Sequence, residues 1–214
     1  MIQGCIFDMD GLLFDTERIF QENWEKIAAE RGIVLPPSFA GDIMGTSGEK
    51  MNRILETYYR PYKGEEIQRE CKKRAEAVLK NHVPLMPGAV EILETCKALQ
   101  IKTAVASSSP MEQIKANLSR TGTDVFFDAL VSGEEVEKGK PAPDIFLLAS
   151  ERIHVPPACC LVFEDSPHGI AGAAAGGFIP VMIPCLLPPT EENKKVAHIY
   201  KNLREAEHAL LKKK

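Results

Sequence analysis

Two aspartates, Asp8 and Asp10, come directly after an apolar run near the start of the chain, in the string DMDGLLFDTE. The run at 2–7 is typical of a short buried strand, and side chains two residues apart in a strand point to the same face. The two carboxylates would therefore repel each other unless a cation or a shared proton intervened. Such a pair costs stability and is useful for chemistry. Taken alone, however, the string DxDG is more often a turn with two solvated aspartates.

Polar residues also follow three later apolar runs. They are Ser107, Ser108 and Ser109 after the run at 102–106, Lys140 in GKPAPDIF after the run at 129–131, and Glu164 and Asp165 after the run at 160–163. In an open α/β sheet, ligands bind beyond the carboxyl ends of the strands. Carboxylates suit Mg²⁺, and hydroxyls, backbone amides and a lysine suit a phosphate. The combination indicates metal-assisted phosphoryl transfer with an aspartate nucleophile.

Each of these groups has an ordinary structural interpretation in isolation. A serine triplet before a proline is usually a helix cap, and we expect Ser109 to be that cap while Ser107 contacts phosphate. Lys140 would alone be an exposed loop lysine, and Glu164 with Asp165 would alone be a turn. Four such coincidences, in this order and at four strand ends, are improbable, so the functional interpretation is favoured.

The elements that would position these residues alternate between strands and helices. The expected buried parallel strands lie at 2–7, 102–106, 129–131, 160–163 and 179–183. Helical patterns separate the last four, at 89–99, at about 110–120, from 143 to about 152, and from 167 after Ser166 as its cap. This alternation predicts an α/β fold with a doubly wound, Rossmann-like parallel sheet.

Residues 16–84 interrupt that alternation, because they contain helical patterns and no good strand. We therefore expect a helical cap domain at 16–84, inserted after the first strand into a catalytic core made of 1–15 and 85–214. The two crossings would lie at one place and form a natural hinge. From about residue 191 onward, the pattern of apolar residues predicts one amphipathic helix at the carboxyl end.

Composition narrows the possible partners. The 214 residues carry a formal net charge of −4, which argues against a nucleic-acid binder, and no apolar run approaches the roughly 20 residues that span a bilayer. The six cysteines show no CxxC spacing, and the start of the chain shows no signal-peptide pattern. We expect reduced thiols in a cytoplasmic protein. The sequence leaves the oligomeric state open.

The four segments DMDGLLFDT, VASSS, KGKPAPDIF and VFEDSPHGI resemble, in order and spacing, the four motifs of the haloacid dehalogenase-like superfamily of phosphohydrolases. The resemblance covers 1–16 and 85–185. The helical insert is more loosely similar to the cap of the branch that contains β-phosphoglucomutase and small sugar-phosphate phosphatases. The resemblance implies Mg²⁺ as the cofactor and a small phosphorylated metabolite as the partner.

It also implies roles for the residues of the first motif. Asp8 would attack phosphorus and become an aspartyl-phosphate. Asp10 would protonate the leaving oxygen and then activate the water that hydrolyses the intermediate. Asp8, through its carboxylate, and Asp10, through its backbone carbonyl, would also bind Mg²⁺.

The resemblance implies further roles for the later motifs. Ser107 would hydrogen-bond the transferring phosphoryl group, with Ser108 beside it in the phosphate site. Lys140 would neutralise the charge shared by the nucleophile and the phosphate. Asp165 would ligate the metal, and Glu164 would support it directly or through water.

The reaction is expected to be hydrolysis of a phosphate monoester, because dehalogenases of the superfamily lack an aspartate at the position of Asp10. The pattern of β-phosphoglucomutase has a histidine where this chain aligns Phe20 and an arginine where it places Gly48. Without that arginine the chain has one contact fewer for a second phosphate. We therefore expect a phosphatase for a sugar phosphate or nucleoside monophosphate, with specificity set by the loop at 44–47. A β-phosphoglucomutase-like phosphomutase and a non-catalytic phosphometabolite-binding protein are the alternatives.

Overall fold

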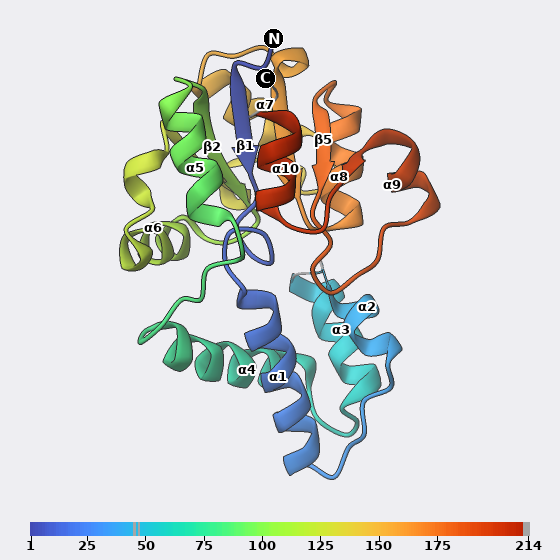
Figure 1. Ribbon diagram of the computed structural model, residues 1–214. Helices are drawn as coiled ribbons and strands as arrows, with labels where there is room; N and C mark the ends of the chain where they lie inside the picture. The colour runs from blue at the N-terminus through green and yellow to red at the C-terminus, as the bar shows by residue number, and fades with distance from the viewer. Residues whose placement is uncertain (45, 47, 212–214) are drawn as a thin grey trace. The chain divides into compact units, whose positions relative to one another are not determined.

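The computed structural model describes residues 1–44, 46 and 48–211 (Figure 1). The chain divides into two compact units. We call the first, Met1–Asp15 with Pro84–Lys214, the sheet unit, and the second, Thr16–Val83, the helical unit.

Within its described residues, the sheet unit contains a six-stranded sheet in the order β3-β2-β1-β4-β5-β6, and every pairing is parallel. The strands are β1 (Gly4–Phe7), β2 (Lys102–Ser107), β3 (Ala129–Ser132), β4 (Cys160–Glu164), β5 (Ile179–Met182) and β6 (His198–Ile199). The chain builds outward from the central β1 to one edge and then from β4 to the other. The predicted doubly wound α/β fold is confirmed.

Helices connect and cover these strands. They are α5 (Ala89–Ala98), α6 (Met111–Thr121), α7 (Asp144–Arg152), α8 (Pro167–Ala175), α9 (Glu191–Val196) and α10 (Leu203–Leu210), with short 3-10 turns η1 (Asp124–Phe126), η2 (Gly133–Glu135) and η3 (Pro157–Cys159). Figure 1 shows α5 and α10 side by side across one face of the sheet. Ser166 caps α8 as expected, because its hydroxyl accepts a 3.0 Å hydrogen bond from the amide of Gly169.

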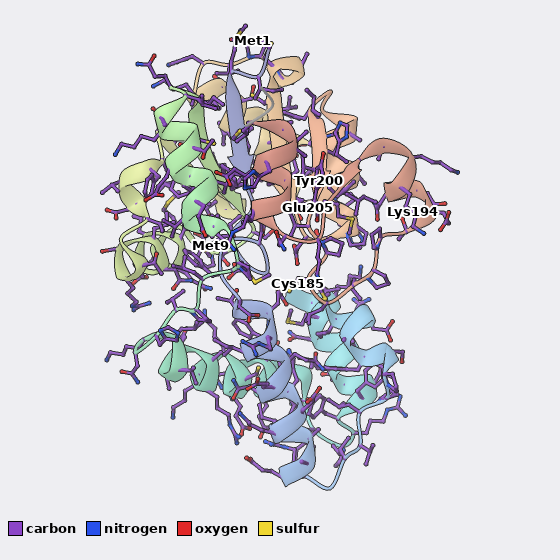
Figure 2. The ribbon with its side chains drawn as sticks, viewed as in Figure 1. Met1, Met9, Cys185, Lys194, Tyr200 and Glu205 are labelled. Carbon is purple, nitrogen blue, oxygen red and sulfur yellow. The ribbon has the colours of Figure 1, made fainter. Side chains whose placement is uncertain are left out.

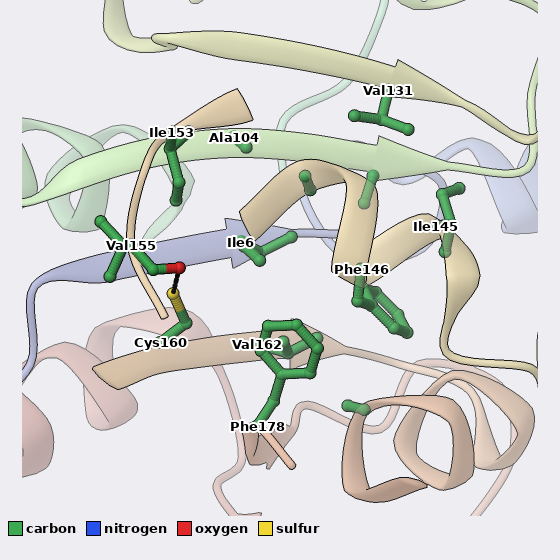
Figure 3. Close-up of a cluster of buried hydrophobic side chains, with 13 residues drawn as sticks. Ile6, Ala104, Val131, Ile145, Phe146, Ile153, Val155, Cys160, Val162 and Phe178 are labelled. Atoms are coloured by element: carbon green, nitrogen blue, oxygen red, sulfur yellow. Dashed lines mark hydrogen bonds between the residues drawn. The ribbon is translucent and has the colours of Figure 1, made fainter. Parts of the chain in front are cut away.

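The sheet is buried on both faces. On one face, Ile6 and Val162 pack with Phe146 of α7 in a cluster of buried side chains (Figure 3). Neighbouring strand residues point the other way, where Phe7 and Phe163 stack with ring centroids 4.8 Å apart. Burial on both faces explains why the strands read as nearly continuous apolar runs.

The expectation of a single amphipathic helix from about residue 191 onward is wrong. The chain forms α9, then the short strand β6, which pairs with Val181 and Met182 of β5, and then α10. Ile199 therefore belongs to a strand rather than to a helix face. The break is local in origin, because the side chain of Asn202 accepts a 2.9 Å hydrogen bond from the amide of Glu205 and starts a new helix.

The helical unit contains α1 (Thr16–Glu30), α2 (Ser38–Ile43), α3 (Gly48–Tyr58) and α4 (Gly64–Leu79). These helices enclose their own apolar core, in which Trp24 and Phe39 are buried and Phe20 is partly buried. The hydroxyl of Tyr59, the residue after α3, donates a 2.7 Å hydrogen bond to the carbonyl of Trp24 in α1. The short helix α2 was not foreseen.

An ionic network joins α1 to α4. Arg74 donates to both carboxylate oxygens of Glu30, at 2.7 and 2.5 Å, and to Glu70 at 2.5 Å. Arg31 donates to the other oxygen of Glu70 at 2.5 Å. Glu70 is thus shared between two arginines, which links the end of the first helix to the middle of the last.

The chain leaves and re-enters the sheet unit at one place. The amide of Asp15 donates to the carbonyl of Pro84 at 2.9 Å, and the amide of Met86 donates to the carbonyl of Leu13 at 2.9 Å. Along the described part of the chain, no helix combines the length and the apolar character needed to cross a membrane. All six cysteines are described, and none of them forms a disulfide.

Candidate active site

Asp8 and Glu164 lie side by side at the carboxyl ends of β1 and β4. The register pairs Ile6 with Val162, and the amide of Asp8 continues the ladder by donating to the carbonyl of Phe163 at 3.0 Å. Because side chains alternate along a strand, residues two positions further on face the same side. Asp8 is 7% exposed and Glu164 only 1% exposed, so two carboxylates are buried together.

The ammonium group of Lys140 lies between these two carboxylates. Its Nζ is 2.6 Å from Oδ1 of Asp8 and 2.5 Å from Oε1 of Glu164, and it donates to the carbonyl of Ala106 at 3.1 Å. The three N–H donors of an ammonium group therefore each have an acceptor. The side chain is 9% exposed, and Nζ lies 5.0 Å from the ring centroid of Phe146. Lys140 is therefore a buried lysine and not the exposed loop lysine that the residue alone would suggest.

Burial dominates the electrostatics of this cluster. Burial raises the pKa of Asp8 to about 8, an effect that Lys140 opposes and that the carboxylates of Glu164 and Asp10 reinforce. Burial acts to lower the pKa of Lys140, but Asp8 and Glu164 outweigh it, so the pKa is raised and the ammonium form persists. Lys140 contacts the two acidic groups Asp8 and Glu164, and Asp10 acts on Asp8 from nearby, so acidic groups outnumber the ammonium group and favour a further cation.

Glu164 is held from its other side by the first turn of α8. Its Oε2 accepts from the amide of Ser166 at 3.0 Å and from the hydroxyl of Ser166 at 2.9 Å. A β-carbon built on Gly169 would lie 2.0 Å from the carboxyl carbon of Glu164. Sequence reasoning did not single out Gly169, and the available signal was a glycine in the first turn of a helix that opens at a strand end.

Asp10 lies on a tight turn after β1. The carbonyl of Met9 accepts from the amides of Leu13 and Phe14 at 3.0 and 3.1 Å, and Gly11 has a φ of 82°, which favours glycine. Met9, which lies between the two aspartates in the sequence and is labelled in Figure 2, is fully buried. The turn fixes the backbone of Asp10 and leaves its side chain partly exposed.

Ser107, at the end of β2, and Ser109, two residues later, lie close to the side chain of Asp10, and Ser109 does not have its expected role. The hydroxyl of Ser109 donates to Oδ2 of Asp10 at 2.7 Å, and the hydroxyl of Ser107 lies 3.5 Å from the same oxygen. The expectation that Ser109 caps the following helix is wrong, because Pro110 occupies the cap position of α6 without a side-chain hydrogen bond. Ser107 is buried and Ser108 is exposed.

Asp165 follows Glu164 and is 4% exposed. Within the described ranges, no three side chains of histidine, cysteine, aspartate or glutamate gather closely enough to hold a metal by themselves. Mg²⁺ does not require such a set, because it is usually bound by one or two carboxylates together with water and substrate oxygens. Buried carboxylates at the strand ends are donors of the type it prefers.

The loop expected to set specificity is only partly described. Gly45 and Ser47 lie outside the described residues. The hydroxyl of Thr46 donates to the carbonyl of Ile43 at 2.6 Å, so its proton is already used within the helical unit. Gly48 begins α3 with a φ of 55°.

Comparisons with known proteins give the family of the chain and agree with its α/β fold. A family model described as haloacid dehalogenase-like hydrolase matches residues 2–177. A Drosophila melanogaster protein named "Probable pseudouridine-5'-phosphatase" is 37% identical over 204 residues, covering 92% of this chain and 87% of that protein. The Thermotoga maritima "Phosphorylated carbohydrates phosphatase" is 33% identical over 177 residues, covering 82% of each. The crystal structure of β-phosphoglucomutase from Clostridium difficile superposes with a TM-score of 0.77 at 25% identity, covering 95% of this chain and 92% of that one.

Proposed function

The chain belongs to the haloacid dehalogenase-like hydrolases, and from this membership we propose that it is a Mg²⁺-dependent phosphatase that hydrolyses a small phosphate monoester through an aspartyl-phosphate at Asp8. Its relatives include phosphatases, so hydrolysis of a phosphoric monoester is the activity of the family branch to which it is similar. The metal, the intermediate, the substrate class and the residue roles are the proposal.

One observation carries the proposal: Lys140 joins the carboxylates of Asp8 and Glu164 at the ends of β1 and β4, with both distances at or below 2.6 Å. A nucleophilic carboxylate has to be held still and must approach an anionic phosphate. The buried ammonium group serves both needs. It fixes one oxygen of Asp8, and it offsets the negative charge that would repel the phosphate. Glu164, which is held by Ser166, keeps Lys140 in position.

In the first step, a carboxylate oxygen of Asp8 forms a bond to phosphorus while the ester P–O bond breaks. Asp10 gives a proton to the leaving oxygen and becomes a carboxylate. In the second step, Asp10 takes a proton from a water molecule whose oxygen attacks phosphorus, and the bond from Asp8 to phosphorus breaks to release inorganic phosphate. Ser107 and the neighbouring loop at Ser108 would hydrogen-bond the phosphoryl oxygens.

Carboxylates of Asp8 and Asp165, with the backbone carbonyl of Asp10, would hold the metal. This set fits Mg²⁺, since it offers two carboxylates and one carbonyl and leaves positions for water and phosphate. Bound Mg²⁺ would supply charge neutralisation and Lewis-acid polarisation of the phosphoryl group. Both oxygens of Glu164 already accept hydrogen bonds from Lys140 or Ser166, so we assign Glu164 to the support of the site rather than to direct ligation.

We assign the helical unit the role of a cap that selects the substrate, and the sheet unit the role of the catalytic core. The relatives' names specify a nucleoside 5'-phosphate and phosphorylated carbohydrates. Sugar phosphates and nucleoside monophosphates are therefore the proposed substrate class, in keeping with a polar loop at 44–47.

The test is release of inorganic phosphate, with Mg²⁺ present, from a panel of sugar phosphates and nucleoside monophosphates. Asp8→Asn serves as the blank, because it keeps the shape of the side chain and removes the nucleophile. Release by the wild type alone supports the proposal. Equal release by Asp8→Asn, or none by the wild type from any ester, would overturn it.

A phosphomutase is the second candidate, favoured by the structural similarity to β-phosphoglucomutase. Conversion of β-glucose 1-phosphate to glucose 6-phosphate without release of phosphate would establish it. Phe20, which packs partly buried in the core of the helical unit, and Gly48 stand where the mutase pattern has a histidine and an arginine. This difference keeps the phosphatase as the favoured function.

A further inference from the structure

Ser109 donates a hydrogen bond to the side chain of Asp10. Its hydroxyl lies 2.7 Å from Oδ2, a normal length for a hydroxyl bound to a carboxylate, whereas the hydroxyl of Ser107 lies 3.5 Å from the same oxygen. Oγ of Ser107 also accepts from the amide of Ser109 at 3.1 Å. Both hydroxyls lie near the same oxygen of Asp10, and that of Ser109 makes the shorter, better placed hydrogen bond to the carboxylate.

The backbone of Ser109 is fixed in turn from β3. The hydroxyl of Ser132 donates to the carbonyl of Ser109 at 2.7 Å. Ser132 is fully buried and is the register partner of Ser107 across the β2–β3 pairing. Its own amide donates to Oε1 of Glu135 at 2.9 Å. The hydroxyl and the amide of the buried Ser132 are thus both hydrogen-bonded, and the hydroxyl fixes the position of the Ser109 backbone just beyond β2.

Two more contacts hold the same loop. A β-carbon at Gly133 would lie 3.1 Å from the α-carbon of Ser108, so the two loops pack backbone to backbone. The amide of Met111 donates to Oε2 of Glu134 at 3.2 Å, in place of the missing side-chain cap of α6. Glu134 thus provides a side-chain acceptor at the start of α6, while the hydroxyl of Ser109 is directed to Asp10.

We propose that Ser109 is a positioning residue that holds the carboxyl group of Asp10 for proton transfer to the leaving oxygen. This inference rests on the role proposed for Asp10. The turn at 9–14 fixes the backbone of Asp10, and a general acid has to be held close to the oxygen that it protonates. The hydrogen bond from Ser109 holds the carboxyl group itself.

A positioning role for Ser109 predicts a dependence on the leaving group. An alkyl oxygen, as in a sugar phosphate, leaves as a poor alkoxide unless it receives a proton. The p-nitrophenolate ion leaves readily without one. Removal of the Ser109 hydroxyl should therefore slow the first step for the alkyl ester and leave the rate for p-nitrophenyl phosphate nearly unchanged. Loss of a phosphate contact would instead slow the reactions of the two esters alike.

The experiment measures kcat/KM for p-nitrophenyl phosphate and for the fastest alkyl ester of the panel, with wild type, Ser109→Ala and Asp10→Asn. We expect Ser109→Ala to lose about 10- to 100-fold with the alkyl ester and less than about threefold with p-nitrophenyl phosphate. The ratio of the two values does not depend on the folded fraction, so a poorly folding variant still reports. Ser109→Thr should recover the ratio, and Ser119→Ala, an exposed serine of α6, should leave it unchanged.

Equal losses with both esters, or no loss in Ser109→Ala, would overturn the assignment of Ser109. Asp10→Asn separates this from the proposed function. If Asp10→Asn shows the leaving-group dependence and Ser109→Ala does not, only the positioning role fails. If Asp10→Asn lacks it, or if the wild type releases phosphate from no alkyl ester, the proposed function fails and this inference with it.

Discussion

The carboxylate of Glu164 occupies the space where any residue other than glycine at position 169 would place its β-carbon, 2.0 Å from the carboxyl carbon. Glu164 connects Lys140 to the start of α8, so this close approach connects helix packing to the site. A substitution at 169 would have to push the glutamate toward the lysine or the helix away from the sheet.

Gly169→Ala should therefore destabilise the fold by about 1–3 kcal/mol and reduce phosphate release, because overpacking forces side chains or backbone to move. Urea unfolding and initial rates measure the two effects. Gly139→Ala is the matched control, since nothing lies within 4 Å of a β-carbon there. Wild-type stability and activity in Gly169→Ala would show that the helix shifts at no cost.

Replacing Lys140 by methionine should abolish most activity while keeping a similar side-chain length. Asp8 and Glu164 would lose the cation between them, so we expect phosphate release to fall about 100- to 1000-fold. Stability should fall by about 3–5 kcal/mol, because two buried carboxylates lose their partner. Lys138→Met, an exposed lysine of the same loop, is the control. If both variants behave alike, Lys140 does not hold the nucleophile.

Asp165→Asn should weaken Mg²⁺ binding without removing the fold. The half-saturating Mg²⁺ concentration for phosphate release should rise at least about tenfold. A readout apart from activity is the rise in Tm on adding Mg²⁺, which binding to the native state produces and which the variant should largely lose. The exposed Asp124→Asn is the control. An unchanged titration in Asp165→Asn would remove Asp165 from the metal site.

Glu70 should make the stability of the chain depend on acid pH. Burial acts to raise the pKa of Glu70, but hydrogen bonds from Arg31 and Arg74 outweigh it and hold the pKa below its usual value of 4.5. A carboxylate with a lowered folded pKa contributes stability above its unfolded pKa and loses it as the pH falls through the folded pKa.

Glu70→Gln should therefore cost about 1 kcal/mol near neutral pH, and the difference from wild type should narrow below about pH 4.5. Urea unfolding at several pH values measures it, and Glu66→Gln, exposed on the same helix, should show no such convergence. A difference that stays constant with pH would assign the effect of Glu70 to packing rather than to charge.

The strands β1 to β5 and the ends that carry polar groups were predictable, because each of these strands is a short apolar run and β1 to β4 are closed by charged or hydroxyl residues. The convergence of Asp8, Lys140 and Glu164 followed from the rule that parallel strands share a carboxyl edge, and the two hydrogen bonds from Lys140 confirm their contact. The chemical roles of these residues remain predictions.

What could not be predicted depends on partners far away in sequence. Ser109 looks like a helix cap until the position of Asp10, 99 residues earlier, is known. Gly169 looks like one small residue among many until Glu164 is placed against it. The strand β6 has two residues, too few for a period to be read, and it forms because it pairs with β5. Tertiary contacts decide each of these cases.

The helical unit, Thr16–Val83, is a 68-residue insertion. The hydrogen bonds from Asp15 to Pro84 and from Met86 to Leu13 bring its two ends together. At the sheet unit, the two ends of the insertion are therefore as close together as the ends of a short turn. A segment whose ends fit the same gap would meet the strands at the same two residues, Asp15 and Pro84. If the helical unit selects the substrate as proposed, this junction makes substrate choice an exchangeable module, which recombination could replace while the chemistry proposed for the strand ends is retained.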